Sequence, residues 1–229
     1  MRARRHIDRH YEEELADLRR RILEMGGVVE KQIADAMRAM VERDSEAAKA
    51  IIQGDHKVNR LDVEIDEACL RLLALHQPIA RDLRLITTVL KINADLERAG
   101  DLAQNICERT LELNQEPLLK PLIDLPRMAV MAQEMLRDCL NAFVNEDVDL
   151  ALRVCHADDA VDAMLEQVFR ELMSYVMEDP AAITRALRLI FVAKYLERVG
   201  DHATNIAEMV VFMVKGQSIR HLDEPPPSV

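Results

Sequence analysis

LERAGDLAQNICE, residues 96–108, returns almost unchanged as LERVGDHATNIAE at residues 196–208. A second pair of segments, residues 36–58 and 139–161, matches at a shift of 103 residues. Self-similarity at a nearly constant spacing indicates one structural unit that is used twice in the chain. The sequence therefore predicts a tandem repeat whose two halves share one fold.

The composition indicates that each unit is built from helices. Of the 229 residues 49% are hydrophobic, only 3% are aromatic, and Trp is absent, which is typical of helices packed on helices. Apolar residues recur at the helical spacing of about 3.6 residues between the prolines that divide the chain. These segments are 8–43, 45–76, 80–114, 124–145, 147–178 and 181–215. We predict an all-α fold.

Each half of the chain should form a three-helix bundle, and the two bundles should be related by a pseudo-twofold operation. The first bundle is expected at residues 8–114 and the second at residues 126–216. Residues 115–125 contain Pro117 and Pro121 and are predicted to link the bundles. Residues 217–229 are expected to form a disordered tail.

The net charge argues against a nucleic-acid partner, and the cysteines indicate a reducing compartment. The formal net charge of -11 argues against nucleic-acid binding, because a phosphate backbone needs a basic surface. Four cysteines without a CxxC pair lie in apolar contexts, which favours reduced thiols and a cytoplasmic protein. The sequence begins with arginines and glutamates where a signal peptide would be apolar, and no apolar run approaches the roughly 18 residues of a membrane span.

The repeated motif places a polar stripe on a helix. At about 100° per residue, its carboxylates and amides fall roughly opposite the apolar face. Its members are Glu97, Asp101, Asn105 and Glu108 in the first half and Glu197, Asp201, Asn205 and Glu208 in the second. An ordinary solvated helix face, with ion pairs to Arg98 and Arg198, would also explain one such stripe. Its occurrence in both halves, each time with a poor helix former such as Asn, favours a binding site.

A second acidic stripe follows the middle helix of each half. In the first half it consists of Asp55, Asn59, Asp62 and Asp66, and in the second of Asp158 and Asp162. If the middle and third helices pack side by side, these carboxylates meet, and they either raise one another's pKa or bind cations. Oxygen ligands suit Mg, Mn, Fe or Zn. Leu165 and Phe169 replace Asp62 and Asp66, so equal occupancy of the two halves is in doubt.

Other residues narrow the kind of site. No His stands three residues after a Glu, so the signature of ferritin-like di-iron bundles is absent. His202 is expected to be a structural or interface histidine. Gly100 and Gly200 leave room either for a partner beside the stripe or for close packing of helices within the bundle, and the sequence does not decide between these.

Several segments, in order and spacing, resemble the PhoU family, the accessory proteins of the phosphate-specific transport system. They are LEMGGVVEKQIADAM, DHKVNRLDVEID, QPIARDLRLI and the doubled LERxGD, and the likeness runs from about Tyr11 to Gly216. The resemblance implies two symmetric three-helix bundles with multinuclear iron or zinc clusters at E(D)xxxD motifs. That motif falls on Glu97, Asp101, Glu197 and Asp201, and the weaker candidates to complete the clusters are Asp55, Asp62, Asp66, Asp158 and Asp162.

The resemblance also implies a role. Such proteins are negative regulators of the phosphate-starvation response that act on a sensor histidine kinase and on the ATPase subunit of the phosphate ABC transporter. They often form homodimers, and they meet the membrane only through their partners. The residues agree with an adaptor that is not an enzyme, because we find no Gly-rich phosphate loop and no activated nucleophile. Two alternatives are a metal-dependent phosphohydrolase with a carboxylate-bridged site and a purely structural helical module.

Overall fold

The computed structural model describes residues 2–54 and 56–220, with side chains from residue 10 onward, and within these ranges the chain forms helices and no strand. The helices are α1 (Arg2–Glu42), α2 (Ser45–Gln53), α3 (His56–His76), α4 (Ala80–Leu113), α5 (Asp124–Asn145), α6 (Val148–Glu178), η1 (Pro180–Ala182) and α7 (Ile183–Lys215). The predicted all-α fold is confirmed. None of the described helices is both long and apolar enough to cross a membrane. Of the expected tail, residues 221–229 lie outside the described ranges.

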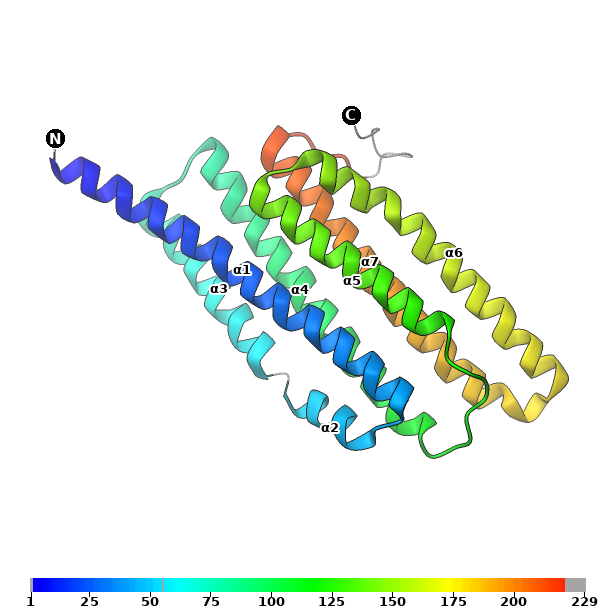
Figure 1. Ribbon diagram of the computed structural model, residues 1–229. Helices are drawn as coiled ribbons and strands as arrows, with labels where there is room; N and C mark the ends of the chain where they lie inside the picture. Colours follow the sequence, from blue (N-terminus) through cyan, green and yellow to red (C-terminus); the bar gives the residue numbers. More distant parts are fainter. Residues whose placement is uncertain (1, 55, 221–229) are drawn as a thin grey trace.

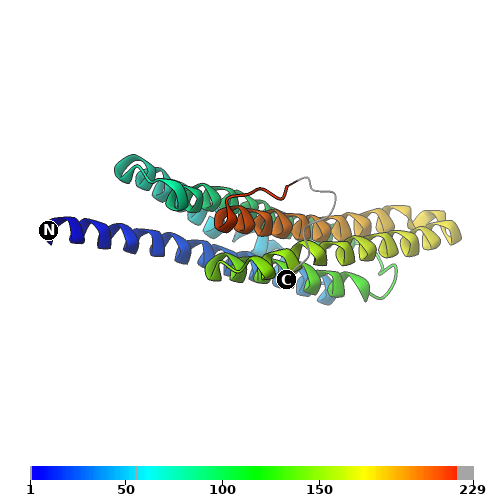
Figure 2. The ribbon, with the colours of Figure 1, turned by 90° about the horizontal axis from the view of Figure 1, so that it is seen from above.

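Two three-helix bundles lie side by side, as the repeat predicts (Figure 1). Helices α1, α3 and α4 form the first bundle, α5, α6 and α7 form the second, and the short α2 packs on α1 and α4. Seen from above, α1 and α5 lie in one layer and α4 and α7 in another (Figure 2). Because α4 packs along α7 and α1 along α5, the two halves share one hydrophobic core.

The repeat extends to the turns that begin the middle helices. Arg43 and Glu146 occupy matching positions and both adopt the left-handed conformation, with φ of 56° and 54°. The next residue in each half is an aspartate that caps the following helix. Asp44 accepts hydrogen bonds from the backbone N–H groups of residues 46 and 47, and Asp147 accepts one of 2.9 Å from Leu150 N. Such caps satisfy backbone donors that the first turn leaves free.

One predicted helix is wrong in detail, because residues 45–76 form two helices. Helix α2 ends at Gln53, and α3 begins at His56. Gly54 caps the end of α2, and its backbone N–H donates to Ala50 O at 2.9 Å. Glycine disfavours a helix interior by about 1 kcal/mol relative to alanine. The second half has Ala157 at the position of Gly54, and there α6 runs unbroken from residue 148 to residue 178.

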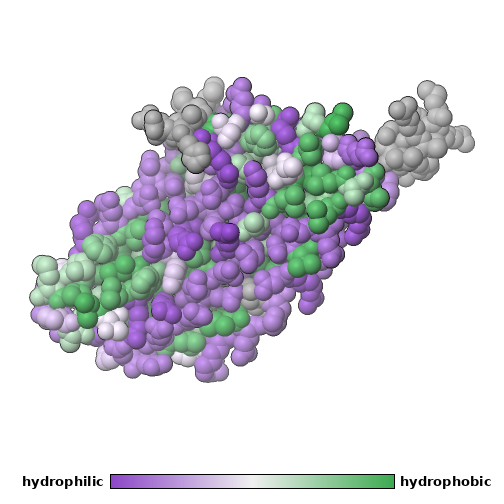
Figure 3. All heavy atoms as spheres, turned by 180° about the vertical axis from the view of Figure 1, so that it is seen from behind, coloured by the Kyte–Doolittle hydropathy of each residue, from purple (hydrophilic) through white to green (hydrophobic). Residues whose placement is uncertain are grey.

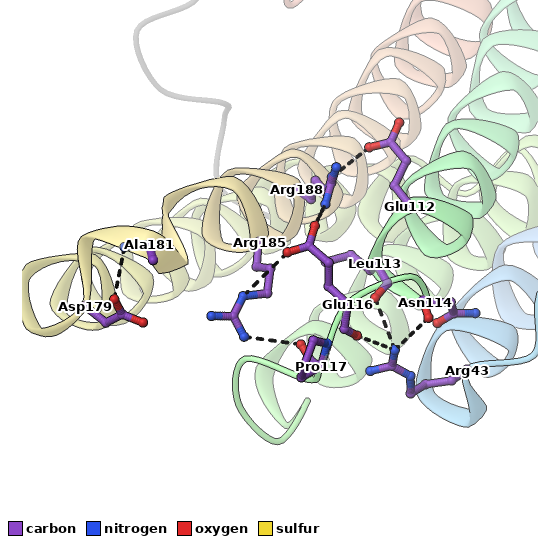
Figure 4. A network of polar contacts seen from close by, with 10 residues as sticks. All are labelled: Arg43, Glu112, Leu113, Asn114, Glu116, Pro117, Asp179, Ala181, Arg185 and Arg188. Atoms are coloured by element: carbon purple, nitrogen blue, oxygen red, sulfur yellow. Dashed lines mark hydrogen bonds and ion pairs between the residues drawn. The ribbon is translucent and has the colours of Figure 1, made fainter.

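A polar network ties the end of the first half to the start of α7 (Figure 4). The Arg43 guanidinium donates through Nη2 to the carbonyl oxygens of Leu113, Asn114 and Glu116 at 3.2, 3.1 and 2.6 Å. Arg188 of α7 donates through Nε to Glu112 Oε2 at 2.9 Å and through Nη1 to the Glu116 carboxylate. These contacts satisfy carbonyls at the C-terminal end of α4 and fix the chain as it leaves the first bundle.

Candidate carboxylate site

The second half brings four predicted carboxylates together where α6 packs against α7. The pKa of Asp158 is raised to about 6, first by burial and then by the charges of Asp201, Asp162 and Glu197. The pKa of Asp162 is also raised, first by burial and then by the charge of Asp201. Mutual repulsion of this kind requires the carboxylates to lie close together. The two acidic stripes of the second half therefore meet, as the sequence predicts.

Two oxygens of this cluster are buried without a partner. Asp158 Oδ1 and Glu197 Oε2 are inaccessible to solvent and accept no hydrogen bond. Glu197 Oε1, in contrast, accepts a hydrogen bond from Lys194 Nζ. A buried carboxylate oxygen that accepts no hydrogen bond is unfavourable. The geometry leaves two lone-pair positions that a positive charge would satisfy.

The predicted orientation of the stripe needs one correction. Glu197 does not face away from the core, since it is only 7% exposed and is one of the buried residues of α7. Asp162 and Asp201 are exposed, and Asp158 is half-buried. The helical wheel missed this because it shows one helix alone, whereas α6 covers part of the polar face of α7. The cluster has a buried wall and an open side.

The structure decides between the two interpretations of the repeated glycine. Gly200 is buried, and a Cβ there would lie 3.3 Å from Asp158 Oδ1 and 3.6 Å from Met135 Cε. Gly100 is buried in the same way, with Val58 Cγ1 3.4 Å from the position of a Cβ. Close packing within the bundle therefore accounts for both glycines. In the second half, the missing side chain also makes room for the Asp158 carboxylate.

The first half arranges its aspartates differently. The side-chain amide of Asn93 on α4 donates through Nδ2 to Asp62 Oδ1 at 2.7 Å and to Asp66 Oδ1 at 3.0 Å. Burial raises the pKa of Asp62, and the charge of Asp66 adds to that effect. These two candidates thus have a hydrogen-bond donor within the protein. Asp55 lies outside the described residues. Glu97 and Asp101 lie on α4, where Glu97 is half-buried and Asp101 is exposed.

The donor set of the second half fits a cation. Among residues 2–54 and 56–220, no three His, Cys, Asp or Glu side chains already converge in the arrangement of a metal site. The four carboxylates Asp158, Asp162, Glu197 and Asp201 nevertheless supply only oxygen ligands, the type that hard cations prefer, and the charges of the other three raise the pKa of Asp158. The two buried oxygens without partners belong to this same group. Asp158, Asp162, Glu197 and Asp201 are therefore the residues best placed to hold one.

Sequence reasoning missed a contact that joins the two halves beside this site. His202 of α7 lies 2.9 Å through Nδ1 from Asp95 Oδ1 of α4, and Asn205 Nδ2 donates to the same oxygen at 3.4 Å. His202 is thus an interface histidine, as expected, but Asp95 was not singled out. Asn205 of the predicted polar stripe serves this contact between α7 and α4. No sequence signal marked Asp95, because its role depends on how α4 and α7 pack.

Comparison with known proteins shows the same fold in relatives of this chain. Residues 22–110 and 125–210 match the family described as PhoU domain, once for each bundle. The phosphate-specific transport system accessory protein PhoU of Serratia marcescens is 43% identical over 221 residues, covering 95% of this chain and 90% of the relative. The protein of the same name from Escherichia coli is also 43% identical, with the same coverage.

Solved structures agree with the sequence comparison. The crystal structure of PhoU from Pseudomonas aeruginosa superposes with a TM-score of 0.86 at 42% identity, covering 90% of this chain and all of that one. The phosphate transport system regulatory protein PhoU from Streptococcus pneumoniae superposes with a TM-score of 0.85 at 29% identity, covering 91% of this chain and 99% of that one. With both bundles matched in sequence and in structure, the chain belongs to the PhoU family.

Proposed function

We propose that this protein is a regulatory adaptor of phosphate homeostasis. The observation that carries the proposal is 43% sequence identity, over 95% of this chain, to proteins named as accessory to the phosphate-specific transport system. A solved relative at 29% identity is named a phosphate transport system regulatory protein. The likeness extends over both bundles, in sequence and in structure, which supports the same kind of role for this chain.

The adaptor acts as a negative regulator when phosphate is plentiful, in the cytoplasm, by binding the sensor histidine kinase and the ATPase subunit of the phosphate ABC transporter. Long exposed helical faces and a net charge of -11 suit protein partners with basic patches. A homodimer would present each face twice. Contact with the membrane is made through these partners.

We also propose that metal ions, iron or zinc and alternatively magnesium or manganese, bind at the carboxylates of the second half. Asp158, Asp162, Glu197 and Asp201 would hold them, and the buried oxygens of Asp158 and Glu197 are the observation that supports this. A bound cation would supply positive charge to carboxylates that otherwise repel one another. In the first half, Glu97 and Asp101 remain candidates, whereas Asp62 and Asp66 already accept hydrogen bonds from Asn93.

Complementation tests the regulatory role. Escherichia coli that lacks its own PhoU would carry a reporter of a phosphate-starvation promoter and receive either this chain or an empty vector. We expect the chain to restore repression in high phosphate and to leave induction in low phosphate intact, because the relatives match over the whole fold. Full reporter activity in high phosphate, with the chain expressed and folded, would contradict the proposal.

An assay for hydrolysis separates the adaptor from the alternative, a metal-dependent phosphohydrolase. The full chain would be incubated with p-nitrophenyl phosphate and Mg, Mn, Fe or Zn, beside a Glu197→Gln variant. We expect no metal-dependent turnover above that of the variant, because Lys194, a cation next to these carboxylates, is already bound to Glu197. Turnover that requires metal and is lost in the variant would instead establish an enzyme.

A further inference from the structure

An apolar groove lies between α6 and α7, next to the carboxylate site. It has a volume of about 520 Å³ and is walled by four apolar side chains and by the stems of three charged ones. These residues are Leu165, Glu166, Phe169, Arg170, Ile190, Phe191 and Lys194. Phe169 and Phe191 are each 49% exposed, and the ring of Phe191 stacks on Tyr195 with centroids 6.4 Å apart. Two large aromatic side chains held half in solvent are unusual on a surface with few aromatics.

The groove continues into a longer apolar stripe. Ile183, Leu187 and Phe191 follow one another at intervals of four residues on α7 and are 49%, 46% and 49% exposed. Seen from behind, apolar atoms gather at the end of the molecule where α6 and α7 join (Figure 3). Residues four apart lie on one face of a helix, so the three side chains form a single line. A line of this spacing matches the apolar face of another helix.

The first half shows that the fold itself does not require this groove. At the positions of Leu165 and Phe169 it has Asp62 and Asp66, and at the position of Phe191 it has Lys91. Both aspartates accept hydrogen bonds from Asn93, whose counterpart in the second half is Ala193. The same place between two helices is thus polar in one bundle and apolar in the other. The middle and third helices pack against each other in both bundles.

Charge on the rim of the groove indicates the kind of partner. Asp159, Asp162 and Glu166 are exposed on α6 and, at spacings of three and four residues, form an acidic flank beside Leu165. Of the two cations that line the groove, Arg170 lies 3.6 Å from Glu166 and Lys194 is bound to Glu197, so both are paired within the protein. A partner segment along the groove therefore meets apolar side chains on one side and a carboxylate-rich flank on the other. Basic residues on the matching flank of that segment would complement this charge.

We propose that the α6–α7 groove is the docking site for an amphipathic helix of a partner protein, with a leucine- or phenylalanine-rich face and a basic flank. At a rise of about 1.5 Å per residue, a helix of roughly 18 residues would cover the stripe and the acidic flank together. The added helix would lie in the groove between α6 and α7 as a fourth member of the second bundle. This inference rests on the proposed adaptor function, for which it names the surface and the chemistry of the partner.

Peptide binding tests the docking site directly. The probe is a labelled, 18-residue synthetic helix with leucines at helical spacing and lysines on one flank, and its binding to the full chain is measured by fluorescence anisotropy. We expect saturable binding and at least tenfold weaker binding of a peptide that carries glutamates in place of the lysines. Equal binding of both peptides, or of a scrambled lysine peptide, would overturn the proposal.

A comparison of the two halves gives a variant that should remove peptide binding. Phe169→Asp with Phe191→Lys introduces the residues that the first half has at these positions, and both side chains are exposed enough for the fold to tolerate the change. We expect at least a tenfold loss of peptide binding. Val130→Lys, at another exposed apolar residue on α5, serves as the control and should bind the peptide as the wild type does.

Two further measurements separate this site from other uses of an apolar surface. If the double variant turns a dimer into a monomer in sedimentation, or loses binding to anionic lipid vesicles, while the wild type binds no peptide, a second copy or a membrane is the occupant and the proposal is wrong. In the complementation assay, loss of repression by the double variant alone would support the docking site. Repression by a variant that cannot bind peptide would overturn it and leave the regulatory role intact.

Discussion

Two residues, Asp158 and Glu197, carry the chemical argument. Each has one buried oxygen without a hydrogen-bond donor, and each stands beside other carboxylates on α6 and α7. Gly200 makes this possible, because a Cβ there would lie 3.3 Å from Asp158 Oδ1. In the second half, the LERxGD motif thus contributes a buried carboxylate through its glutamate and space through its glycine. Neither contribution is visible without the neighbouring helix.

The raised pKa of Asp158 predicts a pH dependence of stability in protein freed of metal with a chelator. Its pKa rises from 3.8 to about 6 on folding, because the folded protein disfavours the charged carboxylate. The stability that the protonated carboxyl group contributes is therefore fully present below about pH 4 and is lost as the pH rises through about 6. A shift of this size corresponds to at most about 3 kcal/mol, and partial exposure reduces the effect to about 1–2 kcal/mol. In urea denaturation, the free energy of unfolding of Asp158→Asn, relative to that of the wild type, should therefore rise by this amount between pH 4 and pH 7.

Glu178→Gln is the control for this measurement, because Glu178 is an exposed carboxylate of α6 that is not among the charges that raise the pKa of Asp158. Its stability relative to the wild type should change little over the same pH range. If Asp158→Asn showed the same difference from the wild type at pH 4 and at pH 7, the carboxylates would not be coupled as described.

At the scale of single elements, α1 shows how two adjacent glycines serve different ends. Gly26 is buried, and a Cβ added there would collide with Leu140 Cδ1 of α5. Gly27 is exposed, and a Cβ there would meet no atom within 4 Å. The first glycine allows the two halves to approach closely along α1 and α5. The second has no such role in the fold.

The glycine pair gives a prediction of opposite sign at neighbouring positions. Gly27→Ala should raise the free energy of unfolding by about 0.5–1 kcal/mol, because alanine favours a helix interior. Gly26→Ala should lower it by about 1 kcal/mol, since the displacement of the buried Leu140 outweighs the same gain. Thermal denaturation of both variants checks this. A Gly26→Ala protein as stable as Gly27→Ala would show that α1 and α5 pack less closely than described.

The turns before α2 and α6 give a second prediction at this scale. Arg43 adopts a φ of 56°, which a side chain disfavours, and its guanidinium satisfies three carbonyls at the end of α4. Arg43→Ala keeps the strained backbone and loses the contacts, so we expect it to be about 1–2 kcal/mol less stable than the wild type. Arg43→Gly loses the same contacts but relieves the strain.

Chemical denaturation should therefore place Arg43→Gly between the wild type and Arg43→Ala, about 1 kcal/mol above the latter. Both variants should keep the helical content of the wild type. An Arg43→Ala protein at wild-type stability would mean that the network at the end of α4 contributes nothing.

The helices themselves were predictable, because apolar spacing, prolines and the internal repeat all indicate the same segments. The exception, the break at Gly54, depends on one residue that the second half replaces with Ala157. What the sequence could not show is how helices distant in sequence pack. The burial of Glu197 under α6 and the contact between Asp95 and His202 both follow from that packing.

At the scale of the whole molecule, the two halves keep one fold and differ in the surface that they present. Between its middle and third helices, the first half places Asp62 and Asp66 around Asn93, whereas the second places an apolar groove beside four carboxylates. Sequence comparison of the halves revealed the substitutions of Leu165 and Phe169. It put equal occupancy of the two metal sites in doubt, with the fuller set of aspartates in the first half. It did not predict a groove, because the exposure of Phe191 depends on how α6 and α7 pack.

This asymmetry makes the metal content of each half the most direct test of the account. Protein purified without metal-affinity steps would be analysed by mass spectrometry for bound metals, beside Glu197→Gln/Asp201→Asn, Glu97→Gln/Asp101→Asn and the control Glu178→Gln on the exposed end of α6. We expect bound metal in the wild type and in the control, and the larger loss in the variant of the second half. A wild type without metal, or a second-half variant that retains it in full, would contradict the account.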